Sequence, residues 1–575
     1  MTPDPPFPTD SVASASTPVF PRRARNGRQG QPGVAKAVSP RLPLCAESGS
    51  GILPTRAGVR FLPGVLLLIL FAGLSACNAP DTPVPDAATG SSTAAGEPSE
   101  PAEPALIPLA DLRADFDALY AQLQASHYDV YVRRDKADYD ALFERMKADL
   151  TEPLPAHEVR QRFQRFVAHG RIAHARIDLP MERWNAFREA GGKALPLFVR
   201  VDDGRVHVAD DYSGLDQLAI GDELLSVDGV PALAWLEPMR ELVSADNDYM
   251  AYAQMEHMLP ALAWLDHGEV DGHAIELVKP DGRRLALRLP ARSRAEFEAA
   301  KAARTVPAGP DMSTREARML DGGIAYLRPG PFYDNRPDAA NMWDRAAFRA
   351  FIDEAFTGFL AAGAGDLLID LRDNPGGDNS FSDLLVAWFA DRPFRFAEQF
   401  DIRVSAAAVA SNQARLEAQP SDAGGTSAEL AALYAGKQPG SRVGYPIPLV
   451  QPRDGERFRG RVHALINRHS YSNTVLVAAI LQDYGFGRVL GEETSDLAST
   501  YGAMEHFQLP RTGITVGFPK ARILRPSGDD QARGVIPDVA IETPLAGDVH
   551  GEVLERALAL IRSARPAPAG GRTGE

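Results

Sequence analysis

Residues 467–494, NRHSYSNTVLVAAILQDYGFGRVLGEET, combine a short polar stretch with a long apolar one. After a short polar stretch, Val477, Ile480, Leu481 and Tyr484 follow the i, i+3, i+4, i+7 spacing of a helix. The remaining faces are filled by Val475, Leu476, Ala478 and Ala479, so the helix would be apolar nearly all round. We therefore expect a helix that is buried in a core.

Two serines, Ser470 and Ser472, come just before the predicted start of this helix. A hydroxyl at that place meets free backbone N–H groups and the positive end of the helix dipole. Taken alone, such a serine is most simply a helix N-cap. The alternative is a reactive serine, because a buried helix would hold the hydroxyl rigidly.

Residues 367–379, LLIDLRDNPGGDN, are a short apolar run that ends in a polar, glycine-rich turn. The run predicts a buried strand that delivers a loop at its carboxyl end. Glycine lets backbone N–H groups approach a ligand closely, so Gly376 and Gly377 could supply one donor to an oxyanion and the amide of Asn473 the other. A plain turn is the other interpretation of the segment.

The two segments, IDLRDNPGG and SYSNT followed by the helix and GEET, resemble the tail-specific, or C-terminal processing, serine peptidase family. The resemblance covers roughly residues 316–543. It implies an α/β, crotonase/Clp-like layered core in which IDLRDNPGG holds the oxyanion loop. By register with the family pattern, the nucleophile falls on Ser472 and not on Ser470.

The general base is expected to be a histidine. Many family members carry a lysine shortly after the Gly-Glu motif, but here GEET is followed by SDLA, and the only lysine after Ser472 is Lys520, in a different segment. The segment HGRIAHARI resembles the place where a tricorn-like branch keeps its histidine, which makes His174 the candidate base. Histidine suits this role because its ordinary pKa lies near working pH. Three histidines compete for the role, namely His169, His469 and His506.

The acid that orients this histidine is expected just ahead of a strand near the end of the chain, where GVIPDV resembles the family's GV-x-PD pattern. Asp530 is the chosen candidate, with Asp529 and Glu505 as alternatives. No His or Cys cluster has metal-ligand spacing in the sequence, and no Walker-type loop is present. Hydrolysis without a cofactor or metal is therefore the expectation.

The N-terminal part is expected to target the protein for export and to anchor it to a membrane. Residues 1–58 would be disordered or untranslated, with translation beginning near Val59, and residues 59–77 form a lipoprotein signal peptide. The sequence LSAC resembles a bacterial lipobox that lipidates Cys77, and Asn78 favours the outer membrane. Residues 78–108 are a Pro, Ala, Ser and Thr-rich flexible linker. The predicted location is the periplasmic side of the envelope.

Three further domains are expected. Residues 109–185 form an N-terminal helical domain, with Leu112, Phe116, Leu119 and Leu123 in one apolar stripe. Residues 192–292 alternate strands and turns, and AIGDELLSVDGVPA resembles a PDZ-like module that binds extended peptides, although a structural β domain without a ligand is the alternative. Residues 316–565 form the peptidase core.

The formal net charge of −15 argues against nucleic acid as a partner. The sequence predicts a lipid-anchored periplasmic serine peptidase that acts on peptides or proteins. The alternative is a catalytically silent protein on the same fold that binds peptides or an apolar ligand.

Overall fold

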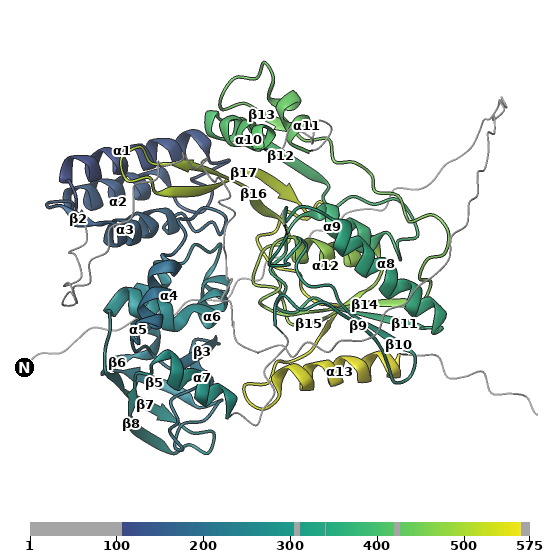
Figure 1. Ribbon diagram of the computed structural model, residues 1–575, viewed down its shortest axis with the longest axis horizontal. Helices are drawn as coiled ribbons and strands as arrows, with labels where there is room; N and C mark the ends of the chain where they lie inside the picture. Colours follow the sequence, from purple (N-terminus) through teal and green to yellow (C-terminus); the bar gives the residue numbers. More distant parts are fainter. Residues whose placement is uncertain (1–105, 304–310, 340, 419–425, 565–575) are drawn as a thin grey trace, which may run out of the picture. The chain divides into compact units, whose positions relative to one another are not determined.

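The structure, a computed structural model, describes residues 106–303, 311–339, 341–418 and 426–564 (Figure 1). The predicted segments 1–58 and 59–77, with Cys77, and nearly all of the linker 78–108 lie outside the described residues. Within the described part of the chain, no helix is both long and apolar enough to cross a membrane.

A six-stranded sheet lies at the centre of the C-terminal part of the chain. Its neighbouring strands are parallel except for the last pair, β10 and β9, which is antiparallel. The strand order is β18 (Val539–Ala540), β15 (Arg488–Gly491), β14 (Arg461–Ile466), β11 (Asp366–Asp370), β10 (Ile324–Arg328) and β9 (Glu316–Leu320). Every residue of β10 and β11 is buried, as expected for parallel strands covered on both faces. The predicted buried strand in residues 367–379 is confirmed.

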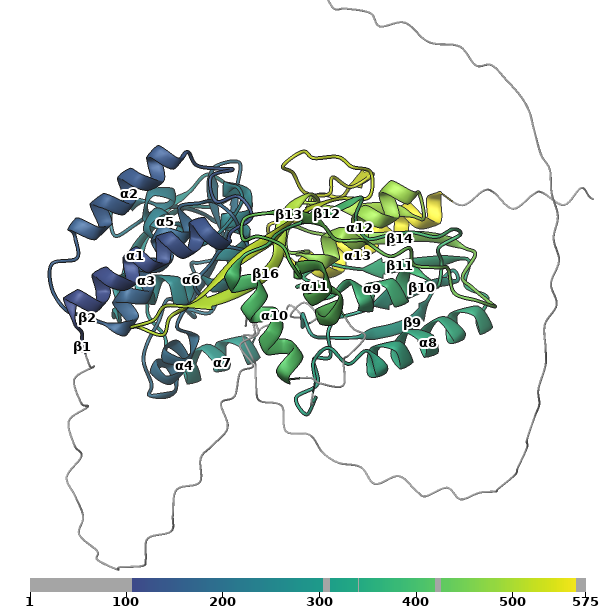
Figure 2. The ribbon, with the colours of Figure 1, turned by 90° about the horizontal axis from the view of Figure 1, so that it is seen from above.

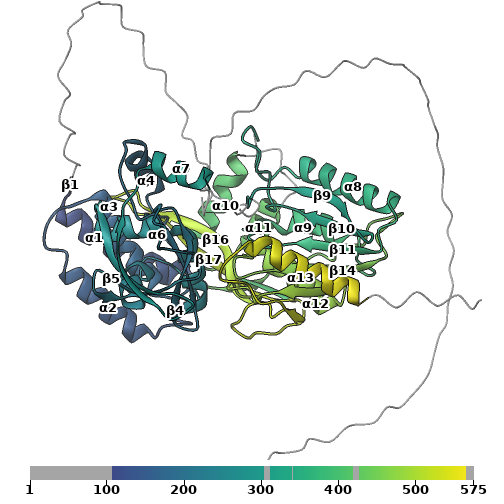
Figure 3. The ribbon, with the colours of Figure 1, turned by 90° about the horizontal axis from the view of Figure 1, so that it is seen from below.

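Helices cover both faces of this sheet (Figure 1). One face packs against α8 (Ala346–Ala361), α9 (Asn379–Val386) and α12 (Asn473–Tyr484), and the other packs against α13 (Val549–Ser563), which lies in front of the strands in Figure 3. Because side chains alternate across a strand, Leu367 and Ile369 join the first layer and Leu368 the second. The predicted layered α/β core is confirmed.

The helix α12 is the helix expected after Ser472, and every residue from Asn473 to Leu481 is buried. Full burial of each large aliphatic side chain contributes about 1.5–3 kcal/mol. The helix ends at Gly485, which has a left-handed backbone conformation with φ 67°. The segment before α12 is therefore anchored by one of the most buried helices in the core.

A second, antiparallel sheet has the order β13 (Arg442–Gly444), β12 (Gln399–Arg403), β17 (Thr515–Leu524) and β16 (Thr500–Gln508) (Figure 2). Between β12 and β13 the chain forms α10 (Ala406–Ala418) and α11 (Thr426–Tyr434). On β17, Ala521 and Ile523 pack with the layered core, whereas Val516 and Phe518 pack with the N-terminal helices. The hairpin of β16 and β17 thus joins two hydrophobic clusters.

The first described part of the chain, residues 106–189, is mainly helical. It contains β1 (Leu106–Ile107), α1 (Leu109–Ser126), α2 (Lys136–Ala148), β2 (Leu154–Pro155), α3 (Ala156–Ala168) and α4 (Met181–Glu189). The predicted stripe of Leu112, Phe116, Leu119 and Leu123 is fully buried on α1.

Residues 197–290 contain an antiparallel sheet with the order β3 (Leu197–Asp202), β4 (Arg205–Asp211), β5 (Glu223–Val227), β7 (Gly272–Val278) and β8 (Arg284–Pro290), and β6 (Val230–Pro231) pairs with β5. The prediction of strands and turns alone was wrong for the middle of this region, which forms α5 (Ala232–Arg240) and the long helix α6 (Asp248–His267). The Asn247 side chain caps α6 by accepting a hydrogen bond from Met250 N. A further helix, α7 (Arg294–Ala302), follows β8.

Candidate active site

Ser472 occupies the N-cap position of α12 in an unusual backbone conformation, with φ 54° and ψ −125°. A non-glycine residue in such a conformation costs on the order of 1–3 kcal/mol, and strain of this kind persists where the surrounding structure enforces it. The Ser472 side chain makes no capping hydrogen bond, and the residue is only partly buried. The hydroxyl is therefore not used to stabilise the helix, in contrast to the N-cap interpretation.

Asp496 holds this strained turn in place. Its Oδ2 accepts a hydrogen bond of 2.5 Å from Ser472 N, and its Oδ1 accepts one of 2.8 Å from Leu497 N. Burial, assisted by the nearby charge of Asp246, raises the pKa of Asp496 to about 7, although the hydrogen bond from Ser472 N opposes this shift. The sequence interpretation missed Asp496 as a site residue, although a carboxyl so close to GEET was the available signal.

The two serines of the segment have different roles. Ser470 Oγ donates a hydrogen bond of 2.9 Å to Leu371 O and accepts one of 3.1 Å from Asn467 N. Ser470 is also completely buried. Its hydroxyl therefore joins the segment before α12 to the end of β11, whereas the Ser472 hydroxyl stays available.

The glycine-rich loop after β11 lies directly against Ser472. Tyr471 N donates a hydrogen bond of 3.0 Å to Asn374 O, which fixes the two loops to each other. A Cβ atom added to Gly376 would lie 2.8 Å from Ser472 Cβ and 2.9 Å from Asn473 N, and Gly376 has φ +88°. Only glycine fits such a position. The structure thus brings together the two segments that the sequence interpretation combined.

The predicted oxyanion donors differ in their surroundings. Gly376 N donates a hydrogen bond of 3.0 Å to the Asn374 side chain, so this N–H group already has an acceptor. Gly377 pairs with Phe332 in an isolated parallel bridge. The bridge consists of hydrogen bonds from Phe332 N to Gly376 O and from Asp378 N to Phe332 O, so it does not use Gly377 N. In the described part of the chain, neither Gly377 N nor Asn473 N donates a hydrogen bond.

His174 lies close to the segment that carries Ser472. Its ring centroid is 5.8 Å from that of Tyr471, and a Cβ atom on Gly502 of β16 would lie 4.0 Å from His174 Cε1. The backbone of Tyr501 hydrogen-bonds the ring, while His174 Nδ1 is buried and lacks a hydrogen-bond partner among the described residues. Burial, assisted by the charge of Arg176, lowers the pKa of His174 to about 4. The imidazole is therefore neutral, and able to accept a proton, at pH 7.

The acidic candidates lie in other contacts. The Asp530 side chain is 57% exposed and pairs with Arg522, and the Asp529 carboxylate pairs with Arg533 at 3.2 Å. Neither carboxylate contacts His174 in the described ranges. The structure thus does not bring the chosen acid, Asp530, into contact with the chosen base.

Glu505 and Lys520 form a buried cluster of their own. The Lys520 ammonium binds Glu505 Oε1, and the same carboxylate binds the Arg415 guanidinium at 2.6 Å. Burial lowers the pKa of Lys520, and the charge of Glu505 opposes this shift. The single lysine that follows Ser472 is therefore engaged in an ion pair.

The competing histidines have other neighbours. The His169 ring packs edge-on against Tyr139 with centroids 5.3 Å apart, and His469 Nε2 lies 3.0 Å from Glu256 Oε2. His506 lies on β16, where burial lowers its pKa.

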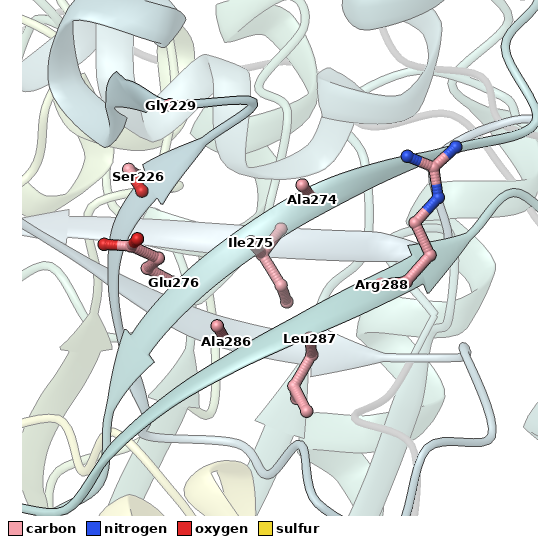
Figure 4. A pocket seen from close by; sticks show the side chains of 8 residues that line it. All are labelled: Ser226, Gly229, Ala274, Ile275, Glu276, Ala286, Leu287 and Arg288. Carbon is pink, nitrogen blue, oxygen red and sulfur yellow. The ribbon is translucent and has the colours of Figure 1, made fainter.

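A hollow of about 340 Å³ lies on the sheet of residues 197–290 (Figure 4). Figure 4 shows Ser226 of β5, Glu276 of β7 and Arg288 of β8 around it. All residues that line the hollow lie between Ser226 and Arg288. The hollow therefore belongs to this sheet and does not include Ser472.

Among the described residues, the Ser472 hydroxyl has no hydrogen-bond partner, and it lies on a strained turn that faces a glycine-rich loop near a neutral histidine. These features define a serine hydrolase site. Residues 330–541 match peptidase family S41. These residues belong to a family of tail-specific proteases, and the protein is a serine-type peptidase. The recognised family and the enzyme class are thereby confirmed.

Similar solved structures with a TM-score above 0.5 support the fold. Mature CPAF complexed with lactacystin is 17% identical, with a TM-score of 0.53 over 79% of this chain and 98% of that chain. Mature CPAF alone gives 17% identity and the same TM-score over 80% and 99%. The photosystem II D1 C-terminal processing protease is 16% identical, with a TM-score of 0.39 over 76% and 96%. A search of curated proteins found no significant match.

Proposed function

We propose that Ser472 and His174 are the catalytic pair of this peptidase, in the manner of the histidine-using, tricorn-like branch of the family. The observation that carries the proposal is the unused hydroxyl of Ser472 on a strained turn packed against Gly376. The neutral, buried imidazole of His174 near the neighbouring residue Tyr471 supports it. In this proposal the backbone of Tyr501 orients the imidazole, a role that the sequence interpretation gave to Asp530.

In the proposed reaction, Ser472 Oγ attacks the carbonyl carbon of a peptide bond while His174 Nδ1 takes the hydroxyl proton. Gly377 N and Asn473 N donate hydrogen bonds to the oxyanion, and losing one such donor typically costs about 10²–10³-fold in rate. His174 then returns the proton to the leaving amine, which leaves an acyl ester on Ser472. A water molecule hydrolyses the ester by the same proton route.

The direct test is labelling of the folded protein with a fluorophosphonate probe, which reacts with activated serines. We expect stoichiometric labelling, together with hydrolysis of unstructured peptides. We also expect lactacystin, which was bound to CPAF in the structure described above, to compete with the probe. A folded protein that takes up no probe would instead favour the catalytically silent binding protein.

The rate of labelling is expected to fall on the acid side near pH 4 and not near pH 6.5. His174 accepts a proton only when neutral, and burial lowers its pKa from 6.5 to about 4, so the active form persists as the pH falls through 6.5. The measurement is the labelling rate constant from about pH 3.5 to about pH 8. A step near pH 7 that disappears in Asp496→Asn would belong to Asp496. A step near pH 6.5 that persists in Asp496→Asn would contradict the role of buried His174.

Residues 192–292 are proposed to be a PDZ-like module that presents extended peptides or unfolded protein ends to the site. Antiparallel strands with two edges, β3 and β8, support this proposal, because an extended peptide can add to a free sheet edge. The hollow shown in Figure 4 lies beside β8, where a peptide side chain could be accommodated.

The protein is also proposed to be anchored to the periplasmic side of the outer membrane through a lipid on Cys77. The apolar run and LSAC in residues 59–77 support this proposal. We expect the wild type to incorporate labelled palmitate and to sediment with membranes. Cys77→Ala should lose the label and become soluble, whereas Cys45→Ala should behave as the wild type. Labelling of Cys77→Ala would contradict the proposal.

A further inference from the structure

Three residues from distant parts of the chain form a cluster beside the candidate active site. They are His257 of α6, Asp373 of the glycine-rich loop and His469, three residues before Ser472. One ligand atom from each residue lies within 4.8 Å of the others. The rings of His257 and His469 have centroids only 4.0 Å apart.

The polar atoms of this cluster are not satisfied by ordinary hydrogen bonds. His257 Nε2 and Asp373 Oδ2 are buried and lack hydrogen-bond partners among the described residues. His550 Nε2 of α13, which is also buried, lies 2.9 Å from Asp373 Oδ2. Since buried polar atoms are nearly always partnered, this arrangement indicates a partner that binds nitrogen and oxygen lone pairs.

Neighbouring side chains hold the cluster in the manner typical of metal sites. Glu256 Oε2 lies 3.0 Å from His469 Nε2, which leaves His469 Nδ1 for another contact. Asn467 Nδ2 donates a hydrogen bond of 2.9 Å to Asp373 Oδ1 and leaves Asp373 Oδ2 for the cluster. A carboxylate on the far nitrogen of a ligating histidine fixes the ring and increases its basicity.

The local charges favour a cation. Three carboxylates, those of Asp373, Glu256 and Glu492, lie in or beside the cluster. The guanidinium of Arg468 pairs with both glutamates, and that of Arg200 pairs with Glu492. With both histidines neutral, the three carboxylates and two guanidiniums have a net charge of one negative unit. The net charge around the cluster therefore does not repel a divalent cation.

We propose that His257, Asp373 and His469 bind a transition-metal ion of the Zn²⁺ class, with His550 or water as the fourth ligand. Two imidazoles and a carboxylate are ligands that Zn²⁺ commonly takes, at about 2.0–2.2 Å. Tetrahedral ligands at that distance stand roughly 3.4 Å apart, so the spread of up to 4.8 Å closes through small side-chain movements. The sequence offered no metal-ligand spacing because each ligand is separated from the next by roughly a hundred residues, and the three lie on different elements.

The bound ion acts as a clamp. It ties α6 of the 192–292 region to the glycine-rich loop that faces Ser472 and to the segment that leads into α12. The site depends only on the fold, so it stands independently of the catalytic roles proposed for Ser472 and His174.

The test is metal binding by the full chain after treatment with a chelator. We expect one Zn²⁺ per chain by titration calorimetry, tetrahedral d–d absorption with Co²⁺, and a thermal midpoint several degrees higher with excess Zn²⁺. His257→Gln and His469→Gln should each weaken Zn²⁺ binding by at least about 100-fold and lose the Co²⁺ spectrum.

The matched control is His157→Gln, which removes a partly exposed histidine of α3 and should bind Zn²⁺ as the wild type does. Circular dichroism establishes that each variant is folded. Equal Zn²⁺ affinity in the wild type and both cluster variants would overturn the proposal, and so would a folded wild type that binds no Zn²⁺. Fluorophosphonate labelling of the chelated protein separates this result from a failure of the proposed catalytic pair.

Discussion

Ser472→Ala is expected to abolish fluorophosphonate labelling and to lower kcat/KM for peptide hydrolysis by roughly 10⁶-fold, the loss typical of removing a serine nucleophile. The Ser472 hydroxyl makes no capping hydrogen bond, so its removal leaves α12 intact. The backbone bond from Ser472 N to Asp496 is retained as well. The thermal midpoint should therefore stay close to that of the wild type. The measurements are probe uptake, peptide hydrolysis and thermal unfolding of the same preparation.

The control for this prediction is Ser470→Ala, which removes the other hydroxyl of the segment. Ser470 is completely buried, and its Oγ hydrogen-bonds Leu371 O and Asn467 N. Leaving these two buried backbone groups without a partner costs about 1–3 kcal/mol each. This variant should unfold at a lower temperature but should still take up the probe when folded. The opposite pattern, with labelling lost in Ser470→Ala and kept in Ser472→Ala, would assign the nucleophile to Ser470.

Gly376→Ala is expected to reduce labelling by at least about 10²-fold, because it displaces the backbone on which the oxyanion donors lie. The added methyl group would stand 2.6 Å from Tyr471 O and 2.9 Å from Asn473 N, and backbone atoms cannot give way as a flexible side chain does. The left-handed conformation of Gly376 adds roughly 1–2 kcal/mol of strain for alanine. The measurements are the labelling rate constant and the urea dependence of unfolding.

Gly440→Ala provides a matched control for the strain alone. Gly440 has φ +87°, nearly that of Gly376, but no atom lies within 4 Å of the position of an added Cβ. This variant should lose stability without losing its labelling rate. If both variants label at the wild-type rate when folded, the glycine-rich loop does not shape the site in the way that we propose.

The sequence was most informative where one short segment determines its own structure. The apolar run before IDLRDNPGG predicted β11, and the helical spacing from Val477 to Tyr484 predicted α12. Both elements are buried on all sides, so their composition alone distinguishes them from surface segments. The two motifs also led to the family, which residues 330–541 match.

The prediction failed at α6, where a long helix lies within a region interpreted as strands and turns. The flanking segments that form β3, β4, β7 and β8 have the alternating pattern of strands, and the same interpretation was extended across the residues between them. Asn247 before the helix and the apolar residues at helical spacing after it were the local signals for α6.

The sequence by itself determined which segments form the core and which serine follows the family pattern, because these properties depend on local spacing and burial. Only the tertiary structure decided which groups surround that serine. The carboxylate of Asp496 accepts a hydrogen bond from Ser472 N, and the side chain of Asn374 accepts one from Gly376 N. His257 of α6 lies close to Asp373 and His469. Such contacts join residues whose separation along the chain leaves no periodic pattern. They form only when strands and helices pack, and so they are fixed by the fold and not by any one segment.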